Sequence, residues 1–125
     1  MSELRVLLVD DEEELVSTLV ERLGFRGIQA DYALDGYQAL DKMKSGDYQV
    51  VVLDLKLPGM AGTDVLQRIT HDYPGIPVLL ITGHGSPVDG QPSQLEGAYD
   101  YLVKPVKLDV MVDRIREAAT AHDRQ

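Results

Sequence analysis

The sequence of 125 residues has 44% hydrophobic residues, 26% charged residues and no cysteine, which is typical of one folded domain and excludes disulfides, thiolate metal sites and cysteine nucleophiles. Its formal net charge of -9 disfavours direct nucleic acid binding by this domain and favours cations or basic partners. Because this length suits a single core, we expect one domain over residues 1–125. No apolar run is long enough to span a membrane or to act as a signal peptide, so we expect a cytoplasmic location and no membrane partner.

Five short apolar runs, separated mostly by segments of helical periodicity, predict βα units and a parallel sheet. The predicted strands cover residues 4–9, 28–32, 50–53, 78–81 and 99–103. The first, third and fourth runs are continuously apolar, which is typical of central strands covered by helices on both faces. The second run alternates between apolar and polar residues, which favours a place nearer an edge of the sheet.

Helical periodicity appears in four segments. The first has an apolar stripe from Leu15 to Leu23 and begins with glutamates, which suit the positive end of a helix dipole. Asp35 is a candidate cap for a helix over residues 37–44, and Thr63 for the helix that follows it. The last helix has its stripe within residues 108–119.

The segment between the predicted fourth and fifth strands departs from this pattern. Gly90 and Pro92 stand where a further helix is expected, and both residue types disfavour a helix interior. We therefore predict no full-length helix over residues 85–96, and only a short turn or helix near residues 92–96.

Polar side chains follow four of the predicted strands: Asp10 and Asp11, Asp54, Thr82 and Lys104. In open parallel α/β sheets ligands bind outside the carboxyl ends of the strands, so these residues should converge on one pocket. Three close carboxylates repel one another and favour a divalent cation, and all-oxygen ligation suits Mg²⁺ or Mn²⁺. A lysine and a hydroxyl facing that cluster indicate a phosphoryl-transfer site with a carboxylate nucleophile.

Each of these residues also has a simpler interpretation. Asp10 and Asp11 could cap the first helix, and Asp54 could be a loop carboxylate before a turn. Lys104 could be a solvated surface charge, and Thr82 could serve only as a strand former. The choice between the two interpretations depends on whether the five side chains meet in space.

Four motifs carry these residues: VLLVDDE at 6–12, VVLDLKLPGM at 51–60, ITGHG at 81–85 and GAYDYLVKP at 97–105. In this order and spacing they resemble the receiver domain of bacterial two-component response regulators, and the resemblance covers essentially the whole chain. We therefore expect an α/β fold, a flavodoxin-like three-layer α/β/α sandwich with five parallel strands in the order 2-1-3-4-5.

The resemblance implies that Asp54 is the phosphoacceptor and that Asp10 and Asp11 are the acidic pair that holds Mg²⁺, with Mn²⁺ as a substitute. The main-chain carbonyl of Lys56 would complete the metal ligands supplied by the chain. Pro105 matches a family position at which the preceding peptide bond is cis.

The resemblance also assigns the groups that contact the phosphoryl oxygens. The main-chain N–H groups of Lys56 and Gly83 would face them, and Thr82 and Lys104 would supply a hydroxyl and an ammonium. Thr82 and Tyr101 match the two switch positions, although an aromatic residue near a strand end is usually part of the core.

The implied function is phosphorylation-dependent signalling. A histidine kinase or phosphotransfer protein would donate a phosphoryl group to Asp54, and a changed output face would act on a downstream effector domain or target protein. Residues 85–96 would be mobile without phosphate and ordered with it. The domain would catalyse its own phosphorylation and dephosphorylation without turning over a separate substrate, so we do not expect a conventional enzyme.

Two other function classes are alternatives to signalling. A phosphatase with an aspartyl nucleophile would use an acidic residue two places after Asp54, where Lys56 stands. A flavin-binding carrier would need glycines and free N–H groups after the first strand, where the chain is acidic.

The sequence departs from the receiver pattern at Ala61, where many receivers have an acidic residue. We expect this difference to affect only the local loop.

Overall fold

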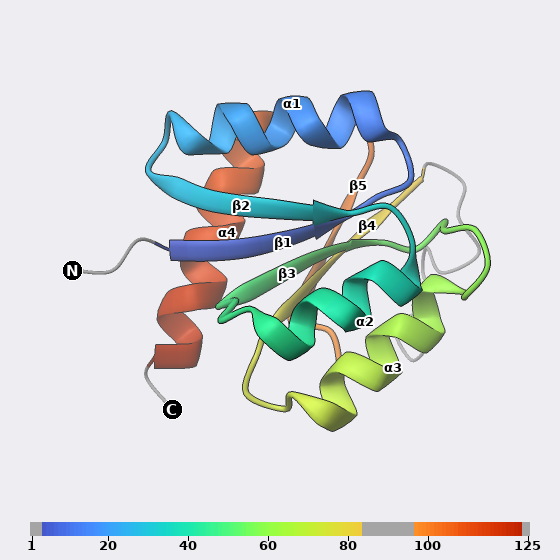
Figure 1. Ribbon diagram of the computed structural model, residues 1–125. Coiled ribbons are helices and arrows are strands. Elements are labelled where there is room, and N and C mark those ends of the chain that lie inside the picture. The colour runs from blue at the N-terminus through green and yellow to red at the C-terminus, as the bar shows by residue number, and fades with distance from the viewer. Residues whose placement is uncertain (1–3, 84–96, 124–125) are drawn as a thin grey trace.

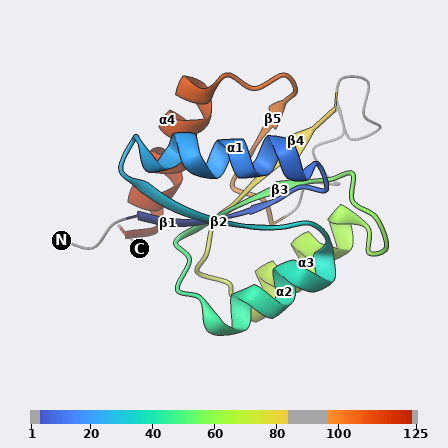
Figure 2. The ribbon, with the colours of Figure 1, turned by 45° about the horizontal axis from the view of Figure 1, so that its top comes forward.

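The computed structural model describes residues 4–83 and 97–123, with side chains to residue 121. One parallel sheet has two of the described helices on each face, α1 and α4 on one side and α2 and α3 on the other (Figures 1 and 2). In chain order the elements are β1 (Leu4–Val9), α1 (Glu13–Gly24), β2 (Ile28–Ala33), α2 (Gly36–Ser45), β3 (Val50–Asp54), α3 (Gly62–Asp72), β4 (Val78–Thr82), β5 (Asp100–Val103) and α4 (Leu108–Asp123). This is the predicted three-layer α/β/α sandwich.

The strand order across the sheet is β2-β1-β3-β4-β5, as predicted, and all four neighbouring pairs are parallel. The three continuously apolar runs are the central strands, and the alternating run is the edge strand β2. The predicted ends differ by one residue at four places. Two of these matter for the site, because Asp54 and Thr82 are the last residues of β3 and β4 rather than the first residues after them.

The sheet separates two hydrophobic cores. Side chains alternate along β1, so that Val6 and Leu8 pack toward α1 and α4 while Leu7 and Val9 pack toward α2 and α3. All four are at most 2% exposed. A parallel strand covered on both faces has no solvent-facing side, which is why the central runs contain apolar residues at every position.

The two predicted helix caps have different outcomes. Asp35 caps α2 as expected, because its Oδ1 accepts the N–H of Gln38 at 2.8 Å. The Thr63 prediction was wrong: α3 begins at Gly62, its cap residue is Ala61, and no side chain caps it. The reason is tertiary, since a Cβ at residue 62 would lie 2.4 Å from the carbonyl oxygen of Leu55, so the first turn of α3 packs directly on that backbone.

The prediction for residues 85–96, with Gly90 and Pro92, lies outside the described residues. In the ranges that are described, no helix has the length and apolarity needed to cross a bilayer.

Candidate functional site

The predicted site residues come together at the carboxyl edge of the sheet. Asp10 follows β1, Asp54 ends β3, Thr82 ends β4 and Lys104 follows β5. Main-chain hydrogen bonds continue the sheet at this edge, from Asp10 N to Ala33 O at 3.0 Å and from Lys104 N to Thr82 O at 2.8 Å. The backbone therefore fixes the positions from which these side chains reach one another.

Three carboxylates form a cluster at this edge. One oxygen each of Asp10, Asp11 and Asp54 lies within 4.8 Å of the others. Asp10 and Asp54 are buried, whereas Asp11 is exposed. Burial raises the pKa of Asp10, and the nearby carboxylates of Asp54 and Glu12 also raise it. The N–H of Glu12 and the charge of Lys104 lower it by less, so the pKa of Asp10 lies above its ordinary value. The cluster therefore holds negative charge that favours a cation.

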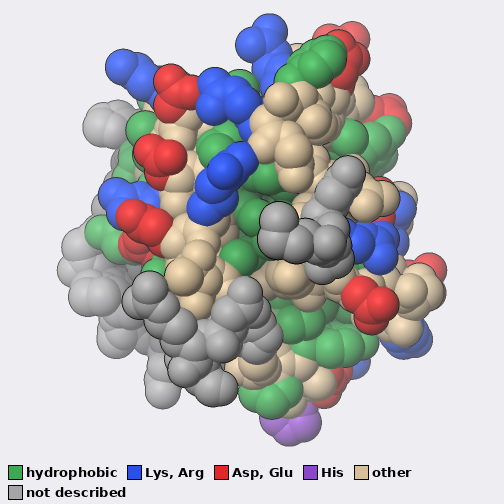
Figure 3. Space-filling model, turned by 90° about the vertical axis from the view of Figure 1, so that its left-hand side faces the viewer, with side chains coloured by type: hydrophobic (Ala, Val, Ile, Leu, Met, Phe, Trp, Pro, Cys, Tyr) green, Lys and Arg blue, Asp and Glu red, His purple; other side chains and the backbone are tan. Residues whose placement is uncertain are grey.

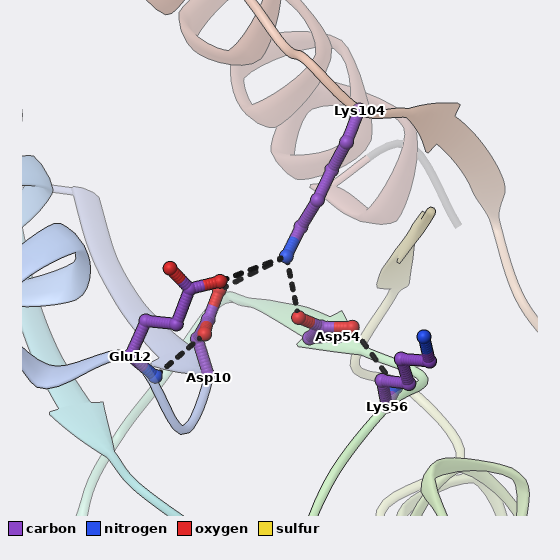
Figure 4. A network of polar contacts seen from close by, with 5 residues as sticks. All are labelled: Asp10, Glu12, Asp54, Lys56 and Lys104. Atoms are coloured by element: carbon purple, nitrogen blue, oxygen red, sulfur yellow. Dashed lines mark hydrogen bonds and ion pairs between the residues drawn. The ribbon is translucent and has the colours of Figure 1, made fainter. Parts of the chain in front are cut away.

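Lys104 supplies one positive charge to this cluster (Figure 4). Its Nζ donates to Asp54 Oδ2 at 2.7 Å and lies 3.8 Å from both Asp10 Oδ2 and Glu12 Oε1. Burial lowers the pKa of Lys104, but the hydrogen bond to Asp54 and the surrounding carboxylates outweigh it, so the pKa lies above its ordinary value. One ammonium thus faces several carboxylates, and it is protonated at neutral pH.

The buried carboxylates are oriented by short-range main-chain bonds. Asp54 Oδ1 accepts the N–H of Lys56 at 2.9 Å, and Asp10 Oδ1 accepts the N–H of Glu12 at 2.9 Å. Both are Asx-type bonds to the residue two positions ahead. The capping interpretation of Asp10 and Asp11 was wrong, because Glu12 is the cap residue of α1 and no side chain caps that helix.

Thr82, the last residue of β4, has a buried hydroxyl. The residue is 1% exposed, and its Oγ1 has no hydrogen-bond partner within residues 4–83 and 97–121. A buried hydroxyl without a partner costs about 1–3 kcal/mol, so this position fits a group that acquires its acceptor from a ligand. Gly83 follows directly and is half-buried.

An open pocket of about 420 Å³ gives access to the carboxylate of Asp54 and the ammonium of Lys104. Asp11, Glu12, Asp54, Lys56 and Lys104 contribute to its lining. Figure 4 shows Lys104 reaching down between Asp10 and Glu12 on one side and Asp54 on the other. The simpler interpretations of Asp54 and Lys104 are therefore wrong, because both side chains are engaged with each other at the pocket.

Tyr101 lies within β5 rather than at its carboxyl end. It pairs in register with Leu80, whereas Val103 pairs with Thr82, so Tyr101 stands two positions back from the end of the strand pair. Its exposed fraction of 41% shows that it is not a core residue. Its role as a switch stays a prediction.

Glu12 is a site residue whose role the sequence left unrecognised. Its acidic side chain suits the start of α1, but its carboxylate also lies 3.8 Å from Lys104 and lines the pocket. The available signal was its position as the third consecutive acid after β1.

The donor set fits a divalent cation of the magnesium type. Asp10, Asp11 and Asp54 offer only carboxylate oxygens, which Mg²⁺ and Mn²⁺ prefer, and no imidazole or thiolate belongs to the cluster. The Lys104–Pro105 peptide bond is cis, as predicted.

A flavodoxin-like parallel sheet with an acidic cluster and a lysine at its carboxyl edge defines a phosphoacceptor signalling domain. The chain belongs to the response regulator receiver domain family, whose model matches residues 6–116. It is thus a receiver domain of two-component response regulators, with the phosphoacceptor role of that family. This membership favours signalling over the phosphatase and flavin-carrier interpretations.

Two transcriptional regulatory proteins illustrate the similarity of this chain to response regulators. Over 116 residues the chain is 37% identical to the transcriptional regulatory protein TcrA of Mycobacterium tuberculosis, a match that covers 93% of this chain and 46% of TcrA. It is 36% identical to the C4-dicarboxylate transport transcriptional regulatory protein DctD of Pseudomonas aeruginosa, covering 91% of this chain and 25% of DctD. The chain thus spans half or less of these curated relatives.

Solved structures are similar over nearly the whole chain. A CheY-like response regulator receiver domain protein from Methanospirillum hungatei superposes with a TM-score of 0.90 at 28% identity, covering 98% of both chains. The response regulator TrrA of Thermotoga maritima, solved in complex with Mg²⁺-BeF, superposes with a TM-score of 0.82 at 30% identity, covering 92% of this chain and 98% of TrrA.

Proposed function

We propose that residues 1–125 form one receiver domain in which Asp54 accepts the phosphoryl group. The observation that carries this assignment is the position of its carboxylate, which is 3% exposed yet borders the open pocket and is held by Lys104 at 2.7 Å. Asp11, although acidic and close by, is exposed and has no comparable contact with a cation among the described residues. Asp54 is therefore the carboxylate best placed as nucleophile.

Asp10, Asp11 and Asp54, with the main-chain carbonyl of Lys56, would hold the divalent cation, which we propose is Mg²⁺, with Mn²⁺ as a substitute. When bound, the cation supplies positive charge that offsets the charge of the phosphoryl oxygens. Asp10 and Asp54 are oriented for this by their bonds from the N–H groups of Glu12 and Lys56.

The proposed transfer moves the phosphoryl group from a phosphohistidine of a histidine kinase or phosphotransfer protein. The bond between phosphorus and the histidine nitrogen breaks, a bond between phosphorus and a carboxylate oxygen of Asp54 forms, and the histidine keeps the electron pair of its broken bond. Lys104 then exchanges a carboxylate oxygen for a phosphoryl oxygen. The Thr82 hydroxyl and the N–H groups of Lys56 and Gly83 would donate to the remaining oxygens.

The same change would produce the signal. Thr82 has a buried hydroxyl with no partner among the described residues, and it would gain an acceptor when the phosphoryl group arrives. Tyr101, on the neighbouring strand and 41% exposed, would respond to the shift of Thr82. The altered face would be recognised by an effector domain or target protein.

Two further expectations stay predictions. One is that the domain catalyses only its own phosphorylation and dephosphorylation, and the other is its cytoplasmic location.

Incubation with acetyl phosphate and Mg²⁺ tests the assignment. The intact mass should increase by one phosphoryl group, and Asp54→Asn should abolish the increase because an amide oxygen is a poor nucleophile. Asp41→Asn, on the exposed side of α2, is the matched control and should be phosphorylated normally. Unchanged phosphorylation of Asp54→Asn would overturn the assignment.

A further inference from the structure

A second pocket lies beneath α1, on the α1 and α4 side of the sheet. It has a volume of about 470 Å³, within the range of small-ligand sites. Its walls are mainly apolar and come from five elements and from the segments after β1 and β5; they include Leu15, Leu19, Val52, Ile81, Val106 and Met111. A volume of this size, surrounded by apolar side chains, suits the body of a small molecule rather than one protruding side chain of a partner.

The polar groups of this pocket lie together on one side. They are Asp10, Glu12 and Lys104, and Glu12 and Lys104 also border the pocket of Asp54. These two side chains therefore form the boundary between the two pockets. Figure 4 shows Glu12 and Asp10 next to one another, both oriented toward the end of Lys104.

The charges at this boundary do not cancel. The ammonium of Lys104 is closest to Asp54, at 2.7 Å, and lies 3.8 Å from the carboxylates of Asp10 and Glu12. Lys104 is therefore paired mainly with Asp54, and it neutralises the charges of Asp10 and Glu12 only in part. The side chain of Glu12 is 64% exposed. An additional positive group would be stabilised here, whereas an anion would be repelled.

We propose that this pocket binds a small amphipathic amine, with its apolar body beneath α1 and its ammonium beside Asp10 and Glu12. The apolar walls would contact the apolar body of the ligand, and the carboxylates of Asp10 and Glu12 would pair with its positive head group. A neutral apolar molecule would leave the carboxylates without a new partner, and a second copy of the chain would bring its own excess of acidic residues, 21 against 12 basic.

Three probes of the same shape separate these possibilities: 4-phenylbutylamine, 4-phenylbutanol and 4-phenylbutyrate. Each is titrated into the unphosphorylated protein without Mg²⁺, at neutral pH, with binding followed by amide chemical shifts. The amine should bind about ten-fold more tightly than the alcohol, and the carboxylate more weakly than the alcohol. The shifts should concentrate on Leu15, Leu19, Val106 and Met111.

Two variants locate the head group and the body. Glu12→Gln removes an exposed charge, so it should fold normally and reduce the preference for amine over alcohol at least three-fold. Glu14→Gln, an exposed glutamate in the first turn of α1, is the control. Leu19→Trp should fill the pocket and weaken all three probes, whereas Leu40→Trp, a partly buried leucine on α2, should not.

Several results would overturn the proposal. Equal affinity for the three probes, or unchanged preference in Glu12→Gln, would contradict a site for a cationic head group. Shifts outside the pocket, or no binding at all, would contradict the ligand site itself. If the lining residues shift with protein concentration in the absence of any probe, the occupant is a second copy of the chain and the proposal is wrong.

Discussion

Two polar clusters lie at opposite ends of the same sheet and differ in how completely their charges are paired. At the carboxyl edge, Lys104 faces the carboxylates of Asp10, Glu12 and Asp54, and the buried hydroxyl of Thr82 has no partner among the described residues. Near the amino ends of β1 and β3, the other cluster contains one arginine and one aspartate. The first cluster has surplus negative charge and the second does not.

The second cluster is built from Arg5, Asp31, Tyr48 and Gln49. The hydroxyl of Tyr48 donates to Asp31 Oδ2 at 2.7 Å, and the Arg5 guanidinium lies 3.7 Å from the same oxygen. The Arg5 guanidinium carbon also lies 5.4 Å from the centre of the Tyr48 ring. The Arg5 N–H donates to Gln49 Oε1 at 2.9 Å, although the buried Arg5 Nε has no partner within the described ranges.

This difference separates a structural cluster from a functional one. Figure 3 views the end of the sheet near the amino termini of the strands, and it shows basic and acidic side chains intermingled on that face. Charges that are neutralised within the fold stabilise it without needing a ligand, whereas surplus carboxylates favour a bound cation. We therefore expect the two clusters to respond in opposite ways to the loss of a charge.

Lys104→Ala should have the largest effect on stability without Mg²⁺. It leaves the buried carboxylate of Asp54 without its cation, and because Lys104 is 31% exposed we expect a loss of about 2 kcal/mol, below that of a fully buried pair. Chemical denaturation in EDTA measures it. Lys44→Ala, on the exposed surface of α2, is the control and should change stability by less than about 0.5 kcal/mol.

The same variant should bind Mg²⁺ more tightly, because the carboxylates lose a competing positive charge. It should still gain a phosphoryl group on Asp54 while responding more weakly to it, since the cation that contacts the phosphoryl oxygens is gone. A Lys104→Ala protein as stable as the wild type in EDTA would contradict the role assigned to this ion pair.

Mg²⁺ should stabilise the wild-type protein by about 1.4 kcal/mol at a ten-fold excess over its dissociation constant. The cation relieves repulsion among Asp10, Asp11 and Asp54. Denaturation with and without Mg²⁺ gives the difference. Asp11→Ala should lose the effect, and Asp31→Asn, in the paired cluster, should retain it. Equal stabilisation of the wild type and Asp11→Ala would argue against the metal site.

Tyr48→Phe should cost about 1 kcal/mol at neutral pH, since it removes a buried hydroxyl that donates to Asp31. Burial, with the hydrogen bond and charge of Asp31, raises the pKa of Tyr48 to about 12. A raised pKa means that the folded protein favours the protonated phenol. This contribution is therefore complete below about pH 10 and lost as the pH rises through 12.

The difference in unfolding free energy between wild type and Tyr48→Phe should accordingly shrink between pH 10 and pH 12. Measuring denaturation of both proteins at several pH values in this window, with tyrosinate absorbance as a second readout, tests the expectation. A difference that does not change with pH would mean that the hydroxyl of Tyr48 does not titrate in this way.

Asp10→Asn should have the smallest effect and the opposite sign, a gain of about 0.5 kcal/mol in EDTA. Burial and neighbouring carboxylates raise the pKa of Asp10, so its charged form is unfavourable in the folded protein, while an amide oxygen can still accept the N–H of Glu12. Asp31→Asn, the same change in the paired cluster, should lose about 0.5 kcal/mol. The same sign for both variants would remove the distinction between the clusters.

Much of the fold was predictable because local patterns carry it. A strand buried on both faces must be apolar at each position, so β1, β3 and β4 were recognisable from their composition, and the alternating run was recognisable as an edge. The site residues were predictable for a related reason. Parallel strands all end at one edge, so Asp10, Asp54 and Lys104 had to approach one another once the sheet was recognised.

Other features depend on contacts between distant parts of the chain. The start of α3 was set by the packing of Gly62 on Leu55 rather than by the capping ability of Thr63. The part played by Glu12 depends on the reach of Lys104, which is 92 positions away in the sequence. The sequence around Gly62 and the sequence around Glu12 contain no local pattern that reveals these contacts.

The sequence by itself determined the parallel sheet, its central strands and the residues at its carboxyl edge, because hydrophobic periodicity and strand ends are local properties. Only the tertiary structure decided which oxygen of Asp54 meets Lys104, that the Thr82 hydroxyl is buried, and that an apolar pocket lies beneath α1. These features depend on how α1, α4 and the strands pack side by side, and packing distances between separate elements are not encoded in the pattern of any one segment.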